Sequence, residues 1–267
     1  MFLYKFFDYK YNIQGFSSDL FSIPHIIYII LGVILAILIG IFSRKINKDK
    51  LTLFLKILSI FVLCFEIVKI TWESYYDIKT GQGFNKAGIL PVYTCSLFIY
   101  TLLLSSFTKG KVREYSLSFL STICLLSGFI GMIYCNGLNW YPFWTFGAFY
   151  SLFFHLAMFL VGVLLITSGY VKLEWRDIYR GWIPMLFLAF IAFPINYEYG
   201  GDYMLLYEAG GVPLYDKLAQ FMAAHSLRWL FGMFMLVSYM ILSTLVISIY
   251  KLVLYFINKK KATNVNE

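Results

Sequence analysis

The sequence predicts an all-α fold, a polytopic helical bundle with about seven transmembrane helices that forms a single integral membrane domain over residues 1–267. Two observations lead to this prediction. Hydrophobic residues make up 60% of the chain and charged residues only 13%. Several apolar runs also reach the roughly 20 residues that a helix needs to cross a bilayer. Seven such helices use most of the chain, so we expect no separate soluble domain.

Each candidate helix follows one apolar run, and charged or turn-forming residues separate the runs. Cation-rich stretches follow the first, third and fifth runs, at Ser43–Lys50, Thr108–Glu114 and Tyr170–Arg180. The stretch Cys135–Pro142, which has no cation, separates the fourth run from the fifth. The long stretch Glu198–Ala224 separates the sixth from the last. The expected helices are Pro24–Phe42, Leu51–Ile70, Ile89–Phe107, Tyr115–Tyr134, Phe143–Ser168, Gly181–Tyr197 and Ser226–Phe256.

The distribution of charge predicts the orientation and limits the possible partners. Lysine and arginine gather in alternate loops and in the carboxyl-terminal tail, so the positive-inside rule predicts an outer amino terminus and a cytoplasmic carboxyl terminus. The net charge of +8 lies in these short loops, and this argues against nucleic-acid binding. The four cysteines show no metal-binding spacing, and no metal or other cofactor is expected. Abundant Phe, Tyr, Ile, Lys and Asn point to a bacterium, and therefore to its plasma membrane.

Two ionisable residues lie in the second apolar run. Glu66 and Lys69 are three residues apart, so they share one face of a helix and can pair. An ionisable group in a span usually faces the bundle interior and marks a site or a pathway. The alternative is that both residues lie near the outer end of the helix and reach towards water.

Cys95 and His155 are the candidate catalytic residues. Pro91 suits the first turn of the third helix, which places Cys95 about one turn inside, where the positive end of the helix dipole favours a thiolate. Cys95 could instead pack in the core, or form a disulfide with Cys135. His155 lies in the aromatic-rich fifth helix, where an imidazole must find a partner or a cavity. Contact between the two requires a tilted helix or an outer cavity, because the helical rise places them at different depths.

These residues resemble the YwaF-like integral membrane family, which is itself similar to animal acyltransferases that use a membrane-embedded cysteine–histidine pair on phospholipids. The family pattern Leu-Pro-Leu-His-Leu-Cys matches Leu90-Pro91-Val92-Tyr93-Thr94-Cys95, and a following aromatic-rich helix ends at Phe153-Phe154-His155. A later asparagine and an Asn-Tyr-Met element match Asn196 and Asp202-Tyr203-Met204. Tyr93 and Asp202 depart from the family's histidine and asparagine. The resemblance implies substrate-binding roles for Glu66, Trp72, Tyr93, Asn196, Asp202 and Tyr203, and the helical face shared with Glu66 adds Lys69 to this set.

The leading hypothesis is therefore acyl transfer or hydrolysis on a membrane lipid, by a lipid acyltransferase or a thioester-forming lipid hydrolase. Cys95 would form the thioester and His155 would act as the base. The alternative is a non-enzymatic binder or transporter of a lipid or small molecule, with seven helices and a polar central cavity. In a third interpretation the polar residues merely bridge helices in an assembly subunit. The head group, acyl chain, acceptor and oligomeric state stay open.

Overall fold

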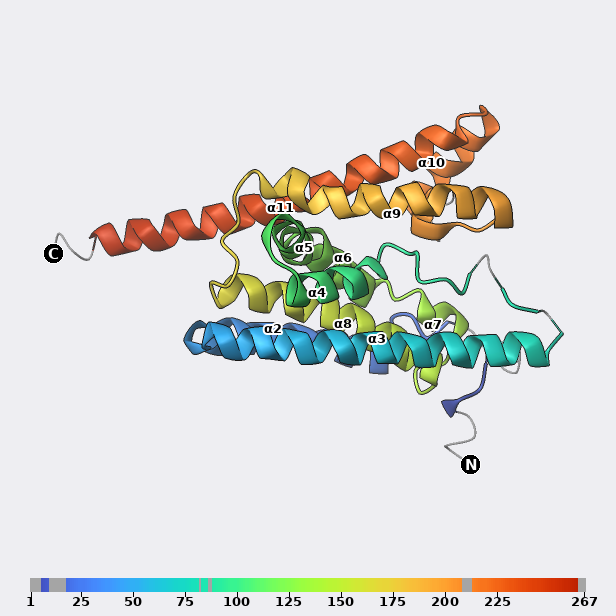
Figure 1. Ribbon diagram of the computed structural model, residues 1–267, viewed down its shortest axis with the longest axis horizontal. Helices are drawn as coiled ribbons and strands as arrows, with labels where there is room; N and C mark the ends of the chain where they lie inside the picture. Colours follow the sequence, from blue (N-terminus) through green and yellow to red (C-terminus); the bar gives the residue numbers. More distant parts are fainter. Residues whose placement is uncertain (1–5, 10–17, 82, 86–87, 208–212, 264–267) are drawn as a thin grey trace.

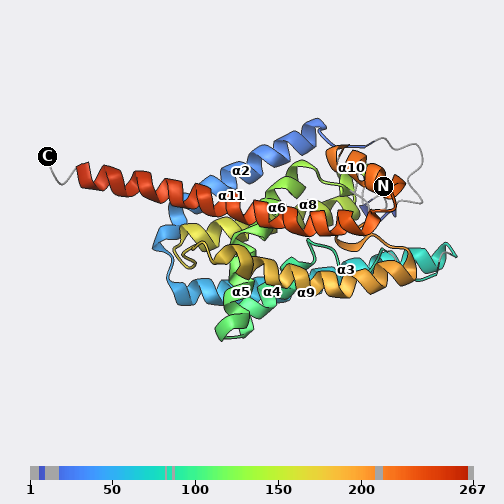
Figure 2. The same ribbon diagram turned by 90° about the horizontal axis from the view of Figure 1, so that it is seen from above.

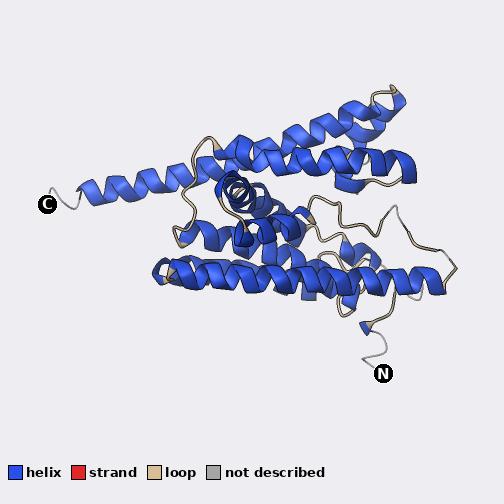
Figure 3. Cartoon of the chain, in the orientation of Figure 1, coloured by secondary structure: helices blue, strands red, loops and turns tan. Residues whose placement is uncertain are grey.

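The computed structural model describes residues 6–9, 18–81, 83–85, 88–207 and 213–263, and none of these lies in a β-strand (Figures 1 and 3). Six helical stretches are long and apolar enough to cross a membrane, which confirms the polytopic helical bundle. The helices of this described part are α2 (Ile23–Phe42), η2 (Ser43–Lys45), α3 (Lys48–Lys79), α4 (Leu97–Phe107), α5 (Gly110–Ser121), α6 (Ile123–Ile133), α7 (Gly137–Trp140), α8 (Phe146–Thr167), α9 (Asp177–Tyr199), η3 (Tyr203–Leu205), α10 (Pro213–Ala224) and α11 (Arg228–Thr263).

The third predicted helix is shorter than expected. The apolar run Ile89–Phe107 is helical only over α4, which has 11 residues and does not reach the length of a span. Proline lacks an N–H group and disfavours helical dihedral angles in the residue before it, so Pro91 prevents Leu90 from starting a helix. The Val92 N–H instead donates to the Leu90 carbonyl oxygen at 2.8 Å. The segment 88–96 is therefore a series of turns that leads into α4.

The fourth predicted helix is broken at Thr122. The run Tyr115–Tyr134 divides between α5 and α6, and Thr122 between them has φ −125° and ψ −89°. Gly181 of α9 approaches closely at this point, because a Cβ atom on it would lie 2.9 Å from the Thr122 hydroxyl oxygen. In Figure 1, α5 is seen end-on, whereas α3, α8, α9 and α11 run along the long axis of the molecule. The break therefore turns α5 across the bundle and lets α9 pack on it.

The remaining predicted helices agree with the structure to within a few residues at most ends, except that α3 and α11 extend further. α3 continues to Lys79 and α11 to Thr263. The separate helix α10 precedes α11, and a turn at Ser226, whose φ is 58°, connects them. In Figure 2, α3 and α11 end at opposite ends of the long axis. The count of seven crossings and the orientation of the termini stay predictions.

Close helix contacts at glycines hold the bundle together. α8 packs against α2 and α6, α4 against α3 and α5, and α9 against α5 and α11. At the contact between α6 and α8, a Cβ atom on Gly128 would lie 2.6 Å from the Phe159 backbone nitrogen, and one on Gly162 would lie 2.5 Å from the Leu125 Cβ atom. Small residues let helix backbones approach in a membrane, where packing rather than hydrophobic burial drives association. The helix that carries His155, α8, is therefore closely packed against α6.

We expect Gly128→Ala to destabilise the protein by about 1–3 kcal/mol, because the new methyl group overlaps backbone atoms of α8 that cannot move independently. Gly40→Ala is the matched control, since the nearest atom to its Cβ would be a Thr167 methyl carbon at 3.8 Å. The control gains helix propensity without a clash. Thermal unfolding in detergent measures both, and equal midpoints for the two variants would contradict the packing described here.

Candidate functional site

Three hydroxyl groups from separate parts of the chain fix the segment 88–96. The Leu90 N–H donates to the Tyr203 hydroxyl oxygen at 2.9 Å, and the Tyr100 hydroxyl of α4 donates to the Pro91 carbonyl oxygen at 2.9 Å. The Thr94 and Tyr239 hydroxyl oxygens lie 3.0 Å apart, which connects the segment to α11. Backbone groups that no helix satisfies need such partners in an apolar environment. The turns that carry Cys95 therefore have a defined position.

Cys95 lies two residues before the first residue of α4 rather than inside a helix. Cys95 is a free residue of intermediate exposure, but its sulfur lies inside the protein against the backbone N–H of Ser96, the residue that precedes α4. The amino-terminal end of a helix carries partial positive charge, which favours an anion there. Cys95 therefore precedes the amino-terminal end of a helix rather than lying one turn inside it, and a thiolate at this position stays a prediction. The other cysteines, Cys64, Cys124 and Cys135, are also free.

The inner face of α3 presents a row of ionisable groups to this segment. Glu66, Lys69, Glu73 and Asp77 follow one another at intervals of three and four residues, so they share one helical face. Glu66 is buried and accepts a hydrogen bond from the Tyr150 hydroxyl of α8. Lys69 forms its direct ion pair with Glu73, at 2.7 Å between Nζ and Oε2, rather than with Glu66.

Glu66 and Lys69 both interact electrostatically with Cys95. Burial opposes a thiolate at Cys95 most strongly and the negative carboxylate also opposes it, whereas the ammonium group and the Ser96 N–H favour one. The Lys69 Nζ atom also lies 5.8 Å from the centre of the Tyr150 ring. The structure thus brings together a thiol, a carboxyl group, a tyrosine hydroxyl and an ammonium group, from α3, α8 and the segment before α4.

His155 lies on the same stretch of α8 but points towards α6. Its Nδ1 atom lies 2.8 Å from the Ser151 carbonyl oxygen, and its ring covers Gly131, where a Cβ atom would lie 2.2 Å from the imidazole Cδ2 atom. The preceding residue, Phe154, packs its ring 5.5 Å from that of Phe98 in α4. The turn that carries His155 is therefore next to the start of α4, while the imidazole itself faces a glycine of the neighbouring helix.

Asn196 of α9 and Tyr203 of η3 support the segment 88–96. Asn196 donates to the Tyr203 carbonyl oxygen at 3.0 Å and accepts from the Tyr203 N–H at 2.7 Å. The Tyr203 ring in turn lies 4.7 Å from the Tyr93 ring. This clamp holds the loop although Met204, with φ 62°, adopts a left-handed conformation that costs free energy in a residue with a side chain. Asn196 and Tyr203 thus fix the backbone at Leu90.

The other two residues of the predicted substrate-binding set have defined contacts. Asp202 accepts a hydrogen bond from the Tyr207 N–H at 2.8 Å. The Trp72 indole N–H donates to the Phe7 carbonyl oxygen at 3.0 Å, and its ring lies 5.6 Å from that of Tyr141. Trp72 therefore belongs to an aromatic cluster in the last third of α3, about six turns of helix beyond Leu51.

Sequence reasoning missed Tyr150, Thr94 and Tyr239. Each has a hydroxyl group, which needs a hydrogen-bond partner in an apolar environment. Nothing else in the sequence distinguishes these three residues. Within the described ranges, no group of three His, Cys, Asp or Glu side chains is arranged to hold a metal ion.

The fold and this polar cluster define a polytopic helical membrane protein with ionisable groups inside the bundle. The model of the TMEM164 family matches residues 20–221, and the chain belongs to this family. The match includes α2 to α9, the Cys95 segment and η3. No match was found among curated proteins, and none among solved structures.

We expect Tyr203→Phe to destabilise the protein by about 1–3 kcal/mol, because the Leu90 N–H then loses its acceptor in a partly buried place. Tyr197→Phe is the matched control, since Tyr197 is 86% exposed. The same samples should show faster reaction of Cys95 with a maleimide in Tyr203→Phe only. If both variants behave like the wild-type protein, Tyr203 does not hold the segment.

Proposed function

We propose that this protein transfers or hydrolyses an acyl group of a membrane lipid through a thioester at Cys95. The observation that supports the proposal is a free thiol just before α4 that interacts electrostatically with Glu66 and Lys69. A thiol becomes an effective nucleophile when a neighbouring group can take its proton and a helix end favours its anion. The resemblance to the YwaF-like family supports the same chemistry.

The reaction proceeds in two balanced steps. The Cys95 sulfur bonds to the acyl carbonyl carbon, the ester C–O bond breaks, and the thiol proton passes through a base to the departing alcohol. In the second step a lipid hydroxyl, or water, attacks the thioester carbon, the C–S bond breaks, and Cys95 regains a proton. No change of oxidation state occurs, so the reaction needs only the lipid and its acceptor.

The proposal includes two candidate bases, and the contacts of Cys95 favour Glu66. Glu66 interacts electrostatically with Cys95 and is oriented by the Tyr150 hydroxyl. His155, the base that the sequence predicts, lies on the adjacent turn of α8 and has to leave its contact with Gly131 to approach the thiol. In either case Lys69 is placed to attract the negative oxygen of a tetrahedral intermediate or a lipid phosphate.

The predicted substrate-binding residues have different roles in the proposal: some would contact the lipid, and others hold the backbone near Cys95. Lys69 is placed to contact the lipid head group, and the ring of Tyr93 lines the approach to Cys95. Trp72 and Asp202 border this region, whereas Asn196 and Tyr203 act by holding the Leu90 backbone. The orientation predicted from the loop charges places this region towards the outer face of the membrane.

We expect Cys95→Ser to abolish formation of a covalent acyl-enzyme, because the hydroxyl of serine is a much weaker nucleophile than a thiolate. The protein, in nanodiscs, is treated with a long-chain acyl ester probe, and mass spectrometry locates the adduct. Cys64→Ser is the control, because Cys64 is a free, exposed cysteine of α3. An adduct that persists in Cys95→Ser, or lipid turnover that is unchanged, would exclude Cys95 as the nucleophile.

We expect Glu66→Gln to slow acylation of Cys95 by about 10²–10⁴-fold, the usual contribution of a general base, and His155→Gln to slow it less. Glutamine can still accept the Tyr150 hydrogen bond, so the fold is preserved. Rapid-mixing measurement of adduct formation gives both rates. A larger loss in His155→Gln would assign the base to His155. If Glu66→Gln impaired lipid binding while Cys95→Ser had no effect, the non-enzymatic binder would replace the enzyme.

A further inference from the structure

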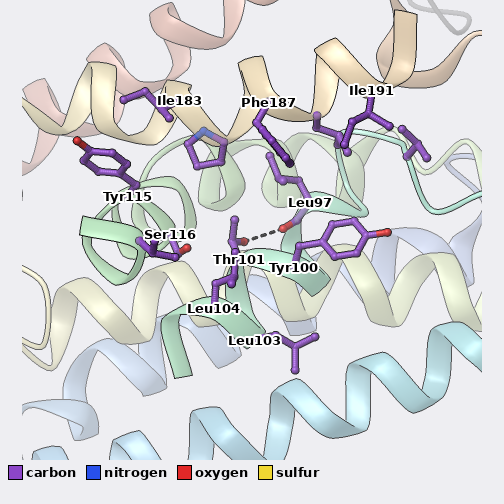
Figure 4. A pocket seen from close by; sticks show the side chains of 14 residues that line it. Leu97, Tyr100, Thr101, Leu103, Leu104, Tyr115, Ser116, Ile183, Phe187 and Ile191 are labelled. Atoms are coloured by element: carbon purple, nitrogen blue, oxygen red, sulfur yellow. Dashed lines mark hydrogen bonds between the residues drawn. The ribbon is translucent and has the colours of Figure 1, made fainter. Parts of the chain in front are cut away.

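An apolar groove of about 670 Å³ lies between α4, α5 and α9 (Figure 4). Leu97 and Tyr100 of α4 and Ile191 of α9 line one end, and Tyr115 of α5 and Ile183 of α9 line the other. The side chains between them are almost all hydrocarbon.

The polar side chains of the groove offer little to a polar ligand. The Thr101 hydroxyl donates to the Leu97 carbonyl oxygen at 2.7 Å, and the Tyr100 hydroxyl donates to the Pro91 carbonyl oxygen. The α9 wall belongs to a stretch that is long and apolar enough to cross the membrane, and Phe187 on it is 69% exposed. The groove is therefore open to the lipid phase at membrane depth, where only a hydrocarbon ligand matches its lining.

One end of the groove lies close to the candidate site, although Cys95 itself is not among the lining residues. Two of its lining residues flank the thiol in sequence, Val92 three residues before and Leu97 two residues after. The Tyr100 hydroxyl interacts electrostatically with Glu66, which also interacts with Cys95. From this end the groove follows α4 towards Leu104 and α9 from Ile191 back to Ile183. Eight residues of helix correspond to about 12 Å, the length of a substantial part of a long acyl chain.

We propose that this groove, lined by α4, α5 and α9, binds the acyl chain of the donor lipid and places its carbonyl carbon at Cys95. This inference rests on the proposed function and adds to it a site for the chain. A short chain fills only the end near Leu97, and a long chain reaches Tyr115 and Ile183. The groove thereby selects for chain length, because each buried methylene adds to binding.

The first test locates the chain without requiring turnover. The full-length protein in nanodiscs is irradiated with a phosphatidyl lipid that carries a diazirine at the end of one long acyl chain, and the crosslinks are mapped by mass spectrometry. Cys95→Ser is included, so that the result does not depend on the reaction. We expect crosslinks concentrated at Tyr115 and Ile183 in both proteins. Crosslinks spread evenly over the lipid-facing surface, as expected for ordinary surrounding lipid, would overturn the proposal.

The second test changes the length of the groove. Ser116 lines the groove on α5, so Ser116→Phe should block its far part and lower the ratio of long-chain to short-chain acylation of Cys95 by at least about tenfold. Phe187→Ala, added to Ser116→Phe, should restore part of the loss by making room on the opposite wall. Thr244→Phe, on an exposed position of α11, is the matched control and should leave the ratio unchanged.

The outcomes separate this proposal from the proposed function. If Cys95 is acylated with the same preference for chain length in all these variants, the groove is not the acyl site, and acyl transfer stands. If no chain of any length acylates Cys95 in folded protein, the proposed function fails. Crosslinks at Tyr115 and Ile183 would then still establish the groove as a hydrocarbon site.

Discussion

The interior of the bundle depends on one constraint: the ionisable side chains of α3 must find partners inside an apolar protein. Charged groups at membrane depth are costly unless they are paired or face polar surroundings. Glu66 meets this requirement through the Tyr150 hydroxyl and Lys69 through Glu73. The first of these contacts connects α3 to α8, and the second lies within α3, on the face from which Glu66 and Lys69 interact with Cys95. The position of Cys95 therefore follows from how the charges of α3 are satisfied.

The same constraint explains why an irregular segment is tolerated next to the site. Turns expose N–H and C=O groups, which in a membrane protein must be bonded within the protein. Tyr203, Tyr100 and Tyr239 supply hydroxyl groups to this segment from η3, α4 and α11. A regular helix at these positions would have buried Cys95 in its own first turn. The break at Pro91 instead places Cys95 just before the amino-terminal end of α4, where it interacts electrostatically with Glu66 and Lys69 of α3.

The fold class could be predicted from the apolar runs, which are long enough to cross a membrane. The bounds of α2, α8 and α9 could be predicted approximately, because they depend on local hydrophobicity. The shortening of the third helix could be suspected only from Pro91, and the break at Thr122 depends on the approach of Gly181, which no local pattern reveals. At the site, the sequence identified Glu66, Lys69 and Cys95, which the structure brings together. It could not give the direction of His155, because an imidazole on a helix points where neighbouring helices leave room, here over Gly131. Tyr150 and Tyr239 were missed because aromatic residues are abundant throughout the chain.

The most direct test of the account is the rate at which Cys95 reacts with a small uncharged thiol reagent in folded wild-type, Glu66→Gln and Lys69→Met protein. A small reagent reports the thiolate present at equilibrium, which the carboxylate opposes and the ammonium group favours, so Glu66→Gln should speed this reaction and Lys69→Met should slow it. Acylation by an ester differs, because there Glu66 also has to carry the thiol proton to the departing alcohol. Glu114→Gln, at an exposed ion pair of α5 with Arg180, should leave the rate unchanged. Opposite changes in the two site variants would establish that Cys95 lies in the field of the α3 charges. Identical rates in all four proteins would contradict the arrangement on which the proposed function rests.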